Sequence, residues 1–365
     1  MEMPLVSVVM SVFNCKPYVR DAIDSILAQC YSNFEFIIID DGSTDGSTEI
    51  LIEYDRNHAN VSLLRQENSG LIESLNRGCA LANGTYIARM DADDVALTDR
   101  LARQVAYLEQ HPNVAAVGGA VRYMNTAGEL LHLSSLNESS AEIRRRLLDG
   151  SPMYHPAVLM RRDAFLRVGG YRKAVVDAED YDLWLRLSDK YDLANLPEVV
   201  LHYRVHAQQV SMRKCKRQAL GSLAARAAAV CRWRGEVDPL DTVEAITDDT
   251  FTRMGISTVS RESAVGRALL CCVDYLDRAD DAAGMATMMP RLYSEVDWSA
   301  VAPPVASDFW LLQSRLAWSG GRPITGAIQL LRAIWVRPLI VGRPIKRIVQ
   351  SWLDVAKRTI FQFNA

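Results

Sequence analysis

The sequence lacks a long apolar run and a strong excess of one charge. No segment reaches the roughly 18 uninterrupted apolar residues that a membrane-spanning helix needs, and the N-terminus carries no secretory signal pattern. The 41 basic and 44 acidic side chains leave a net charge of −3, which argues against general nucleic-acid binding. We therefore expect a cytoplasmic protein without a nucleic-acid partner.

Cysteines with metal-site or disulfide spacing are also missing. The seven cysteines match neither a zinc site nor a disulfide framework, so we expect reduced thiols, as in the cytosol. What the chain does have is an ordinary globular composition, with 49% hydrophobic and 23% charged residues. Its 365 residues are enough for two domains.

The first third of the chain alternates strand and helix patterns. Apolar, β-branched runs predict strands at 5–12, 35–40, 61–65, 85–90 and 114–121, and amphipathic patterns predict helices at 17–30, 47–57, 70–82 and 98–110. Strands that are apolar throughout and alternate with helices indicate a parallel sheet covered on both faces. Further along, the patterns predict a helix at 178–190 and a strand at 198–206.

Polar clusters follow four of these strands. They are Ser11 with Asn14, 40-DDGSTDGS-47, 66-QENSG-70, and Asp91 with Asp93 and Asp94. Parallel sheets bind ligands beyond the carboxyl ends of their strands, so we expect these clusters to converge on one site.

The run 91-DADD-94 puts three carboxylates directly after a buried strand. Like charges that crowd together repel, unless a cation lies among them, and Mg²⁺ and Mn²⁺ prefer carboxylate oxygens. A solvated loop that caps the next helix is the alternative. Glu179 and Asp180 have a similar alternative as ordinary acids in the first turn of a helix.

Eight motifs, in order, carry a family resemblance. They are 6-VSVVMSVFN-14, 35-EFIIIDDGSTDGS-47, 66-QENSGLIESLNRG-78, 84-GTYIARMDADD-94, 155-HPAVLM-160, 169-GGYR-172, 179-EDYDLWLRL-187 and 203-YRVHAQQVS-211. Over about residues 5–212 the chain resembles glycosyltransferase family 2, the inverting enzymes with the GT-A fold. The resemblance implies an α/β class: a Rossmann-like, mostly parallel sheet with helices on both faces, followed here by a C-terminal helical region.

The resemblance also implies roles for individual residues. On the donor side, Asp41 and Ser11 would contact the nucleobase, Asn68 and Gly70 would shape the nucleotide loop, Asp91 would bind the ribose, and Asp93 with His206 would hold Mn²⁺ or Mg²⁺. On the acceptor side, Asp180 would be the general base, and Glu179, Gly170 and Tyr171 would lie near the transferred sugar or the acceptor, with Gly169-Gly170 forming a flexible turn. A packed histidine at a strand end is the alternative for His206.

Two domains follow from this assignment. Residues 1–212 would form the catalytic domain, with a nucleotide-sugar half of about 1–121 and an acceptor half of about 122–212. Residues 213–365 show only helical patterns. Within them, 322–365 carries eight basic residues, one acidic residue and many Trp, Ile and Leu side chains. Such a composition suits an anionic membrane surface or a helical cap with its basic face in water.

The sequence therefore predicts a metal-dependent inverting glycosyltransferase, with UDP-sugar as the preferred donor and a saccharide or lipid-linked saccharide as acceptor. It would act in cell-envelope polysaccharide or glycolipid assembly, in the cytoplasm or on the inner face of the plasma membrane. Two alternatives stay open at this stage. One is a polyprenyl-phosphate sugar synthase, and the other is a non-catalytic protein that binds a nucleotide-sugar or serves as a scaffold.

Overall fold

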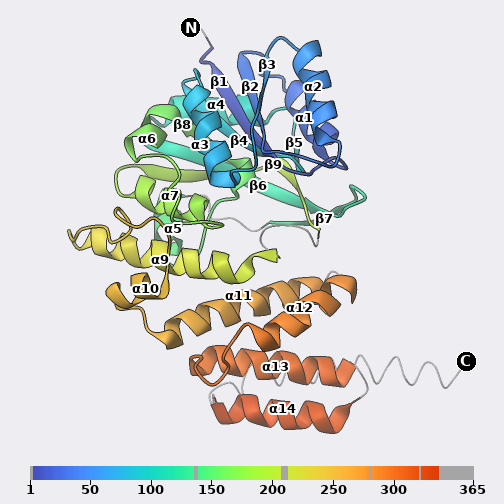
Figure 1. The fold of residues 1–365 in the computed structure, drawn as a ribbon, viewed down its shortest axis with the longest axis vertical. Helices are drawn as coiled ribbons and strands as arrows, with labels where there is room; N and C mark the ends of the chain where they lie inside the picture. The colour runs from blue at the N-terminus through green and yellow to red at the C-terminus, as the bar shows by residue number, and fades with distance from the viewer. Residues whose placement is uncertain (1–2, 135–138, 207–212, 279–281, 320–321, 337–365) are drawn as a thin grey trace, which may run out of the picture. The chain divides into compact units, whose positions relative to one another are not determined.

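The computed structural model describes residues 3–134, 139–206, 213–278, 282–319 and 322–336 (Figure 1). These residues form two compact units. The first contains the described residues of Met1–Arg213 and Ala224–Thr250, and the second contains those of Lys214–Leu223 and Phe251–Ala365.

The first unit is built on a mixed sheet, nine-stranded in the described residues, whose first half is parallel. Its order is β3 (Val61–Arg65), β2 (Phe34–Asp40), β1 (Val6–Val12) and β4 (Tyr86–Asp91). These are the predicted strands, at nearly the predicted bounds. All three pairings are parallel, so the carboxyl ends of the four strands lie at one edge.

Helices cover both faces of this half, as expected from its uniformly apolar strands. The helices α1 (Val19–Leu27), α2 (Ser47–Asn57) and α4 (Arg100–Gln110) share one core with alternate residues of β1. The helix α3 (Leu71–Leu81) packs on the other face. It approaches closely because Gly78 lacks a side chain, since a Cβ there would lie 2.6 Å from Val9 Cγ1.

The second half of the sheet is mixed in direction. After β4 come β8 (Leu159–Arg161), β6 (Val114–Met124), β9 (Asp192–Arg204) and β5 (Val95–Ala96), and β7 (Leu130–Leu133) pairs with β6 alone. Only β6 and β9 run parallel here. The predicted strand at 198–206 was too short at its start, and β5 and β7 were not predicted. Because β5 follows β4 in the chain and yet pairs with β9, the sheet curls on itself.

Short helices connect these strands, and longer ones follow them. The short helices are α5 (Ser140–Arg146), η1 (His155–Ala157), α6 (Arg162–Arg167) and α7 (Glu179–Ser188). The long helix α9 (Cys215–Trp233) comes next, and the short helix α10 (Asp248–Arg253) follows it. Within the first unit, ion pairs hold the segment after α9 in place. Asp238 accepts from Arg172 at 2.9 Å and from Arg232 at 2.6 Å, and Arg232 also binds Asp189 at 2.6 Å.

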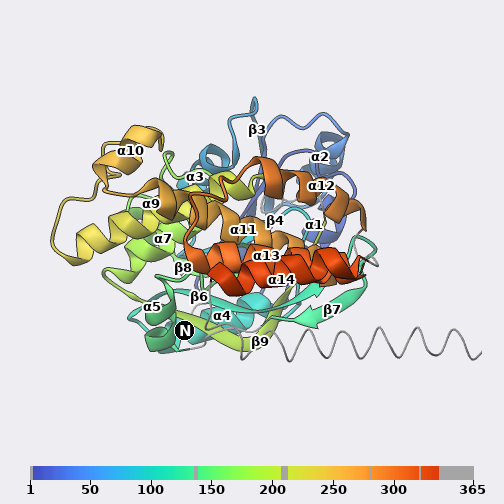
Figure 2. The ribbon, with the colours of Figure 1, turned by 90° about the horizontal axis from the view of Figure 1, so that it is seen from below.

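The second unit is helical. Its main elements are α11 (Thr258–Arg278), α12 (Ala282–Ser294), α13 (Pro303–Ser319) and α14 (Pro323–Val336). The helices α13 and α14 lie side by side in both views (Figures 1 and 2). In the part of the chain that the structure describes, no helix has the length and apolar character to cross a bilayer. Most of the basic, Trp-containing segment at 322–365 lies outside the described residues.

Candidate active site

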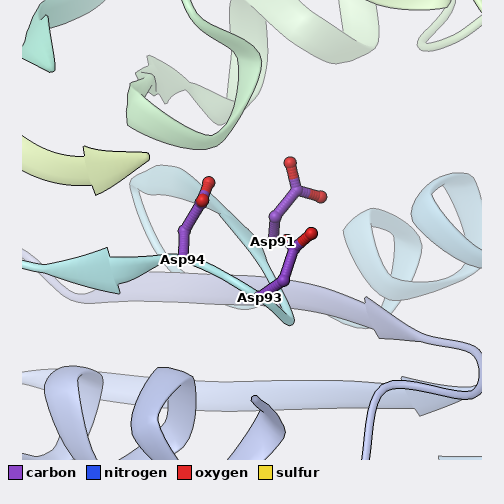
Figure 3. A group of neighbouring side chains, drawn as sticks. All are labelled: Asp91, Asp93 and Asp94. Atoms are coloured by element: carbon purple, nitrogen blue, oxygen red, sulfur yellow. The ribbon is translucent and has the colours of Figure 1, made fainter. Parts of the chain in front are cut away.

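Three carboxylates gather where β4 ends. Asp91, Asp93 and Asp94 each offer an oxygen, and these oxygens lie within 4.8 Å of one another. Figure 3 shows the three side chains rising from one side of the loop, with Asp94 beside the end of β9. The Asp94 Oδ2 atom is buried and has no hydrogen-bond partner among the described residues. Oxygen ligands at this spacing, one of them unpartnered, fit a hard divalent cation.

The protein holds these carboxylates against their mutual repulsion. Arg89 Nη2 donates to Asp91 Oδ1 at 2.5 Å, and the backbone N–H of Arg204 donates to Asp94 Oδ1 at 2.8 Å. Burial, with the charges of Asp93 and Asp91, still raises the pKa of Asp94 well above its ordinary value. Burial also raises the pKa of Asp91, and the positive charge of Arg89 opposes this rise. A bound cation would favour the ionised forms that burial disfavours.

His206 joins this cluster from the residues just after β9. Its Nε2 lies 2.9 Å from Asp93 Oδ2, and its ring packs 5.4 Å from the ring of Tyr18, measured between centroids. The structure thus places together the two residues that the sequence suggested as metal ligands.

A second group of the expected residues lies along the neighbouring strand ends. Asp41, which follows β2, is buried and accepts three hydrogen bonds: from Ser69 N at 2.8 Å, Gly70 N at 2.9 Å and Gln66 Nε2 at 2.8 Å. The loop at 66–70 is therefore folded around this carboxylate, with Gly70 at a φ of 88° that glycine adopts readily.

Ser11 and Asn68, which were also expected near the nucleotide, differ in their surroundings. Ser11 lies near the end of β1 and pairs in register with Asp91 on β4, which brings the first and fourth strand ends together. Asn68 is exposed in the loop at 66–70.

The acidic pair Glu179 and Asp180 begins α7, as the sequence predicted. Burial, with the nearby charge of Asp180, raises the pKa of Glu179 to about 8. Burial also raises the pKa of Asp180 to about 6, against the lowering effects of the Tyr181 backbone N–H and of Arg89. The two neighbouring carboxyls therefore differ in charge near neutral pH, with Asp180 the more ionised.

The turn at Gly170 and Tyr171 is more tightly held than the flexible turn that we expected. Gly170 O accepts from Arg186 Nη2 at 2.7 Å. Tyr171 exchanges two backbone hydrogen bonds with the side chain of Asn76, at 2.8 and 3.0 Å, and its hydroxyl lies 2.8 Å from His155 Nε2. These contacts tie the turn to α3 and to η1, and they fix the position of Tyr171.

Arg89 is a site residue that was not expected from the sequence. This residue is buried in β4 and binds Asp91. Its positive charge also opposes the rise in pKa that burial causes at Glu179 and Asp180. It therefore acts electrostatically on both acidic clusters. The signal was present, because an arginine in the otherwise apolar run 85-TYIARM-90 must find an anionic partner when it is buried.

Comparisons with known proteins point to one family. A profile described as Glycosyl transferase family 2 matches residues 7–169. EpsE of Bacillus subtilis is 36% identical over 193 residues, which make up 51% of this chain and 68% of EpsE. The O-antigen biosynthesis glycosyltransferase WbnJ of Escherichia coli is 35% identical over 209 residues, 55% of this chain and 80% of WbnJ.

Solved structures share the fold. The mannosyltransferase PcManGT from Pyrobaculum calidifontis, in complex with GDP-Man and Mn²⁺, superimposes with a TM-score of 0.50 at 19% identity, over 91% of this chain and 88% of that chain. At this identity the likeness establishes a common architecture, with the curled, mostly parallel sheet of GT-A enzymes.

Proposed function

The chain belongs to glycosyltransferase family 2, and from this premise we propose that it transfers a sugar, with inversion, from a nucleotide-diphospho-sugar to a hydroxyl of a saccharide acceptor. The observation that carries the proposal is the cluster of Asp91, Asp93 and Asp94 at the carboxyl end of β4. A divalent cation, Mn²⁺ or Mg²⁺, would bind there together with the donor diphosphate.

On the donor side, Asp93 and His206 would hold the cation, and Asp91 would bind the ribose. The cation, when bound, supplies positive charge to the departing diphosphate. Asp41 and Ser11 would contact the nucleobase. Since Asp41 also binds the amides of Ser69 and Gly70, nucleobase binding and the shape of the loop that contains Asn68 and Gly70 would be coupled.

On the acceptor side, Asp180 would remove the proton from the acceptor hydroxyl as that oxygen attacks the anomeric carbon. A general base must be ionised to act, and its pKa should lie near the working pH. The pKa of about 6 for Asp180 meets this requirement better than that of about 8 for Glu179. Glu179 would stay largely protonated and could donate a hydrogen bond to the sugar, beside Gly170 and Tyr171.

The donor and the pathway are finer parts of this proposal. We expect UDP-sugar as donor, because UDP-sugars are frequent donors in the family. The carboxylate of Asp41 could accept a hydrogen bond from the ring N–H of uracil, and thymine and guanine offer a similar donor. The relative WbnJ is named for O-antigen biosynthesis, which supports a role in envelope polysaccharide assembly. We further propose a cytoplasmic enzyme whose residues 322–365 contact an anionic membrane surface.

The deciding experiment is a thermal-shift panel of UDP, GDP, dTDP and CMP, with and without Mn²⁺, on the wild type and on Asp93→Ala. A ligand at 100 times its Kd should stabilise the protein by about 2.7 kcal/mol. We expect a shift for one nucleotide that requires Mn²⁺ and is lost in the variant. If no nucleotide shifts the wild type, or if the shift is independent of Asp93, the proposed donor site is wrong.

A further inference from the structure

A group of four aromatic side chains, which we call the aromatic cluster, lies where β6 and β9 end. It consists of Tyr123 on β6, His132 on β7, Tyr154 at the start of η1 and Tyr203 on β9. Tyr123 and Tyr203 pair in register across the two parallel strands, so their side chains project from the same face of the sheet.

The rings of the cluster contact one another closely. The centroid of Tyr203 lies 5.7 Å from that of Tyr123 and 5.8 Å from that of Tyr154, and Tyr123 stacks on His132 at 4.4 Å. The hydroxyls of Tyr123 and Tyr154 are hydrogen-bonded at 2.7 Å. These contacts orient the three tyrosines, so that a ligand would meet rings that are already ordered.

The cluster adjoins the three aspartates. Tyr203 directly precedes Arg204, whose backbone N–H binds Asp94 Oδ1 at 2.8 Å. Burial and the charges of Asp94, Asp91 and Asp93 raise the pKa of the Tyr203 hydroxyl, as expected for a ring close to that acidic group. The tyrosines thus lie within the electrostatic reach of the candidate metal site.

Part of the cluster remains open. The three tyrosines are half-buried and His132 is exposed. Among the described residues, no group forms a hydrogen bond with the Tyr203 hydroxyl. Grouped aromatic surface that stays accessible beside a polar site is typical of a ligand-binding surface, because rings supply apolar contact area and hydroxyls supply orientation.

From this arrangement we infer that the aromatic cluster binds a pyranose ring of the acceptor, with the C–H face of the sugar against Tyr203 and the sugar hydroxyls near the tyrosine O–H groups. The inference rests on the proposed function and adds an acceptor subsite to it. The acceptor is favoured over the donor because the cluster comes from β6, β7, η1 and β9, whereas the proposed nucleotide contacts come from β1, β2, the loop at 66–70 and β4.

The test measures binding of simple glycosides to the full chain by saturation-transfer NMR. The probes are methyl α- and β-glycosides of glucose, galactose, mannose and N-acetylglucosamine. We expect at least one to bind the wild type through its ring C–H protons, and Tyr203→Ala to weaken its Kd about tenfold, the size of one lost stacking contact. Tyr203→Phe keeps the ring and should retain most of the affinity.

Tyr107→Ala is the matched control, because Tyr107 is also half-buried and stacks on a histidine, His111, at 4.1 Å, near the opposite end of β6. It should bind the glycoside as the wild type does. The inference is overturned if no glycoside binds the wild type, or if Tyr203→Ala and Tyr107→Ala bind equally well. The nucleotide thermal shift, measured on the same samples, reports separately on the proposed donor site. A normal nucleotide thermal shift without glycoside binding would therefore refute the acceptor subsite and leave the proposed donor site standing.

Discussion

The Nε2 atom of His206 lies 2.9 Å from Asp93 Oδ2, although 113 residues separate the two in the chain. Asp93 comes from the loop after β4, and His206 from the residues just after β9. The contact exists because Arg204, at the end of β9, binds both the backbone carbonyl of Asp93 and the side chain of Asp94. A histidine placed in this way can share a cation with Asp93 or orient its carboxylate.

His206→Ala should therefore weaken metal binding more than it weakens the fold. We expect the Mn²⁺ concentration for half-maximal activity to rise by about tenfold or more, as for other partners of metal-binding carboxylates. Titration of activity with Mn²⁺ measures this change. The control is His111→Ala, which changes an exposed histidine that follows α4 and is not among the proposed site residues. Equal Mn²⁺ dependence in both variants would refute the role of His206.

Asp180→Asn should abolish transfer and spare the donor site. Loss of a general base typically lowers the rate by about 10²–10⁴-fold. The nucleotide thermal shift should stay as in the wild type, because Asp180 makes no proposed contact with the nucleotide. Asp163→Asn changes an exposed acid at the start of α6 and should leave transfer intact. Normal turnover in Asp180→Asn would mean that another group is the base.

The pH dependence of sugar transfer should reflect the ionisation of Asp180. Since Asp180 acts in its ionised form and has a pKa of about 6, the rate should rise with pH through about 6 on the acid limb. A pH profile of kcat, measured with saturating donor and Mn²⁺, tests this. A rate that stays constant between pH 5 and pH 7 would contradict the assignment.

Glu179 should make the protein less stable as the pH rises. Burial raises its folded-state pKa from an ordinary value of 4.5 to about 8, so the folded form favours the neutral carboxyl. Stability from this group is complete below about pH 4.5 and is lost as the pH rises toward 8. The side chain in Glu179→Gln cannot ionise. The Tm of this variant minus the Tm of the wild type should therefore increase as the pH rises from about 4.5 to 8. Parallel Tm curves for the two proteins would rule out the shift.

Arg89→Met should destabilise the fold, because it leaves Asp91 without its buried partner. Removing one member of a fully buried pair costs about 3 kcal/mol, and the loss here should be smaller because 32% of the Asp91 side chain is exposed. Arg103 offers a matched control, because its pair with Asp99 is exposed and such pairs contribute about 0–1 kcal/mol. Urea denaturation of both variants gives the comparison. In the double variant Arg89→Met with Asp91→Asn, part of the lost stability should return.

Local patterns were enough for the parallel half of the sheet. Strands such as β1 and β2 are apolar along most of their length and are bounded by polar loops, so their type and position follow from composition. The same patterns failed for β5, which has two residues, and for β7, which has four. Strands this short show no measurable period, and they form only because neighbouring strands offer free hydrogen-bonding groups.

The sequence by itself determined which chemical groups this protein carries and that several follow strand ends: Asp41 after β2, Asp91 to Asp94 after β4, and the acidic pair at the start of α7. Only the tertiary structure decided their partners. It placed Arg89 against Asp91, His206 against Asp93, and Tyr203 beside both Tyr123 and the aspartates. The physical reason is that side-chain chemistry is a local property of the chain, whereas the pairing of β6 with β9 and of β5 with β9 brings together residues that lie far apart in sequence.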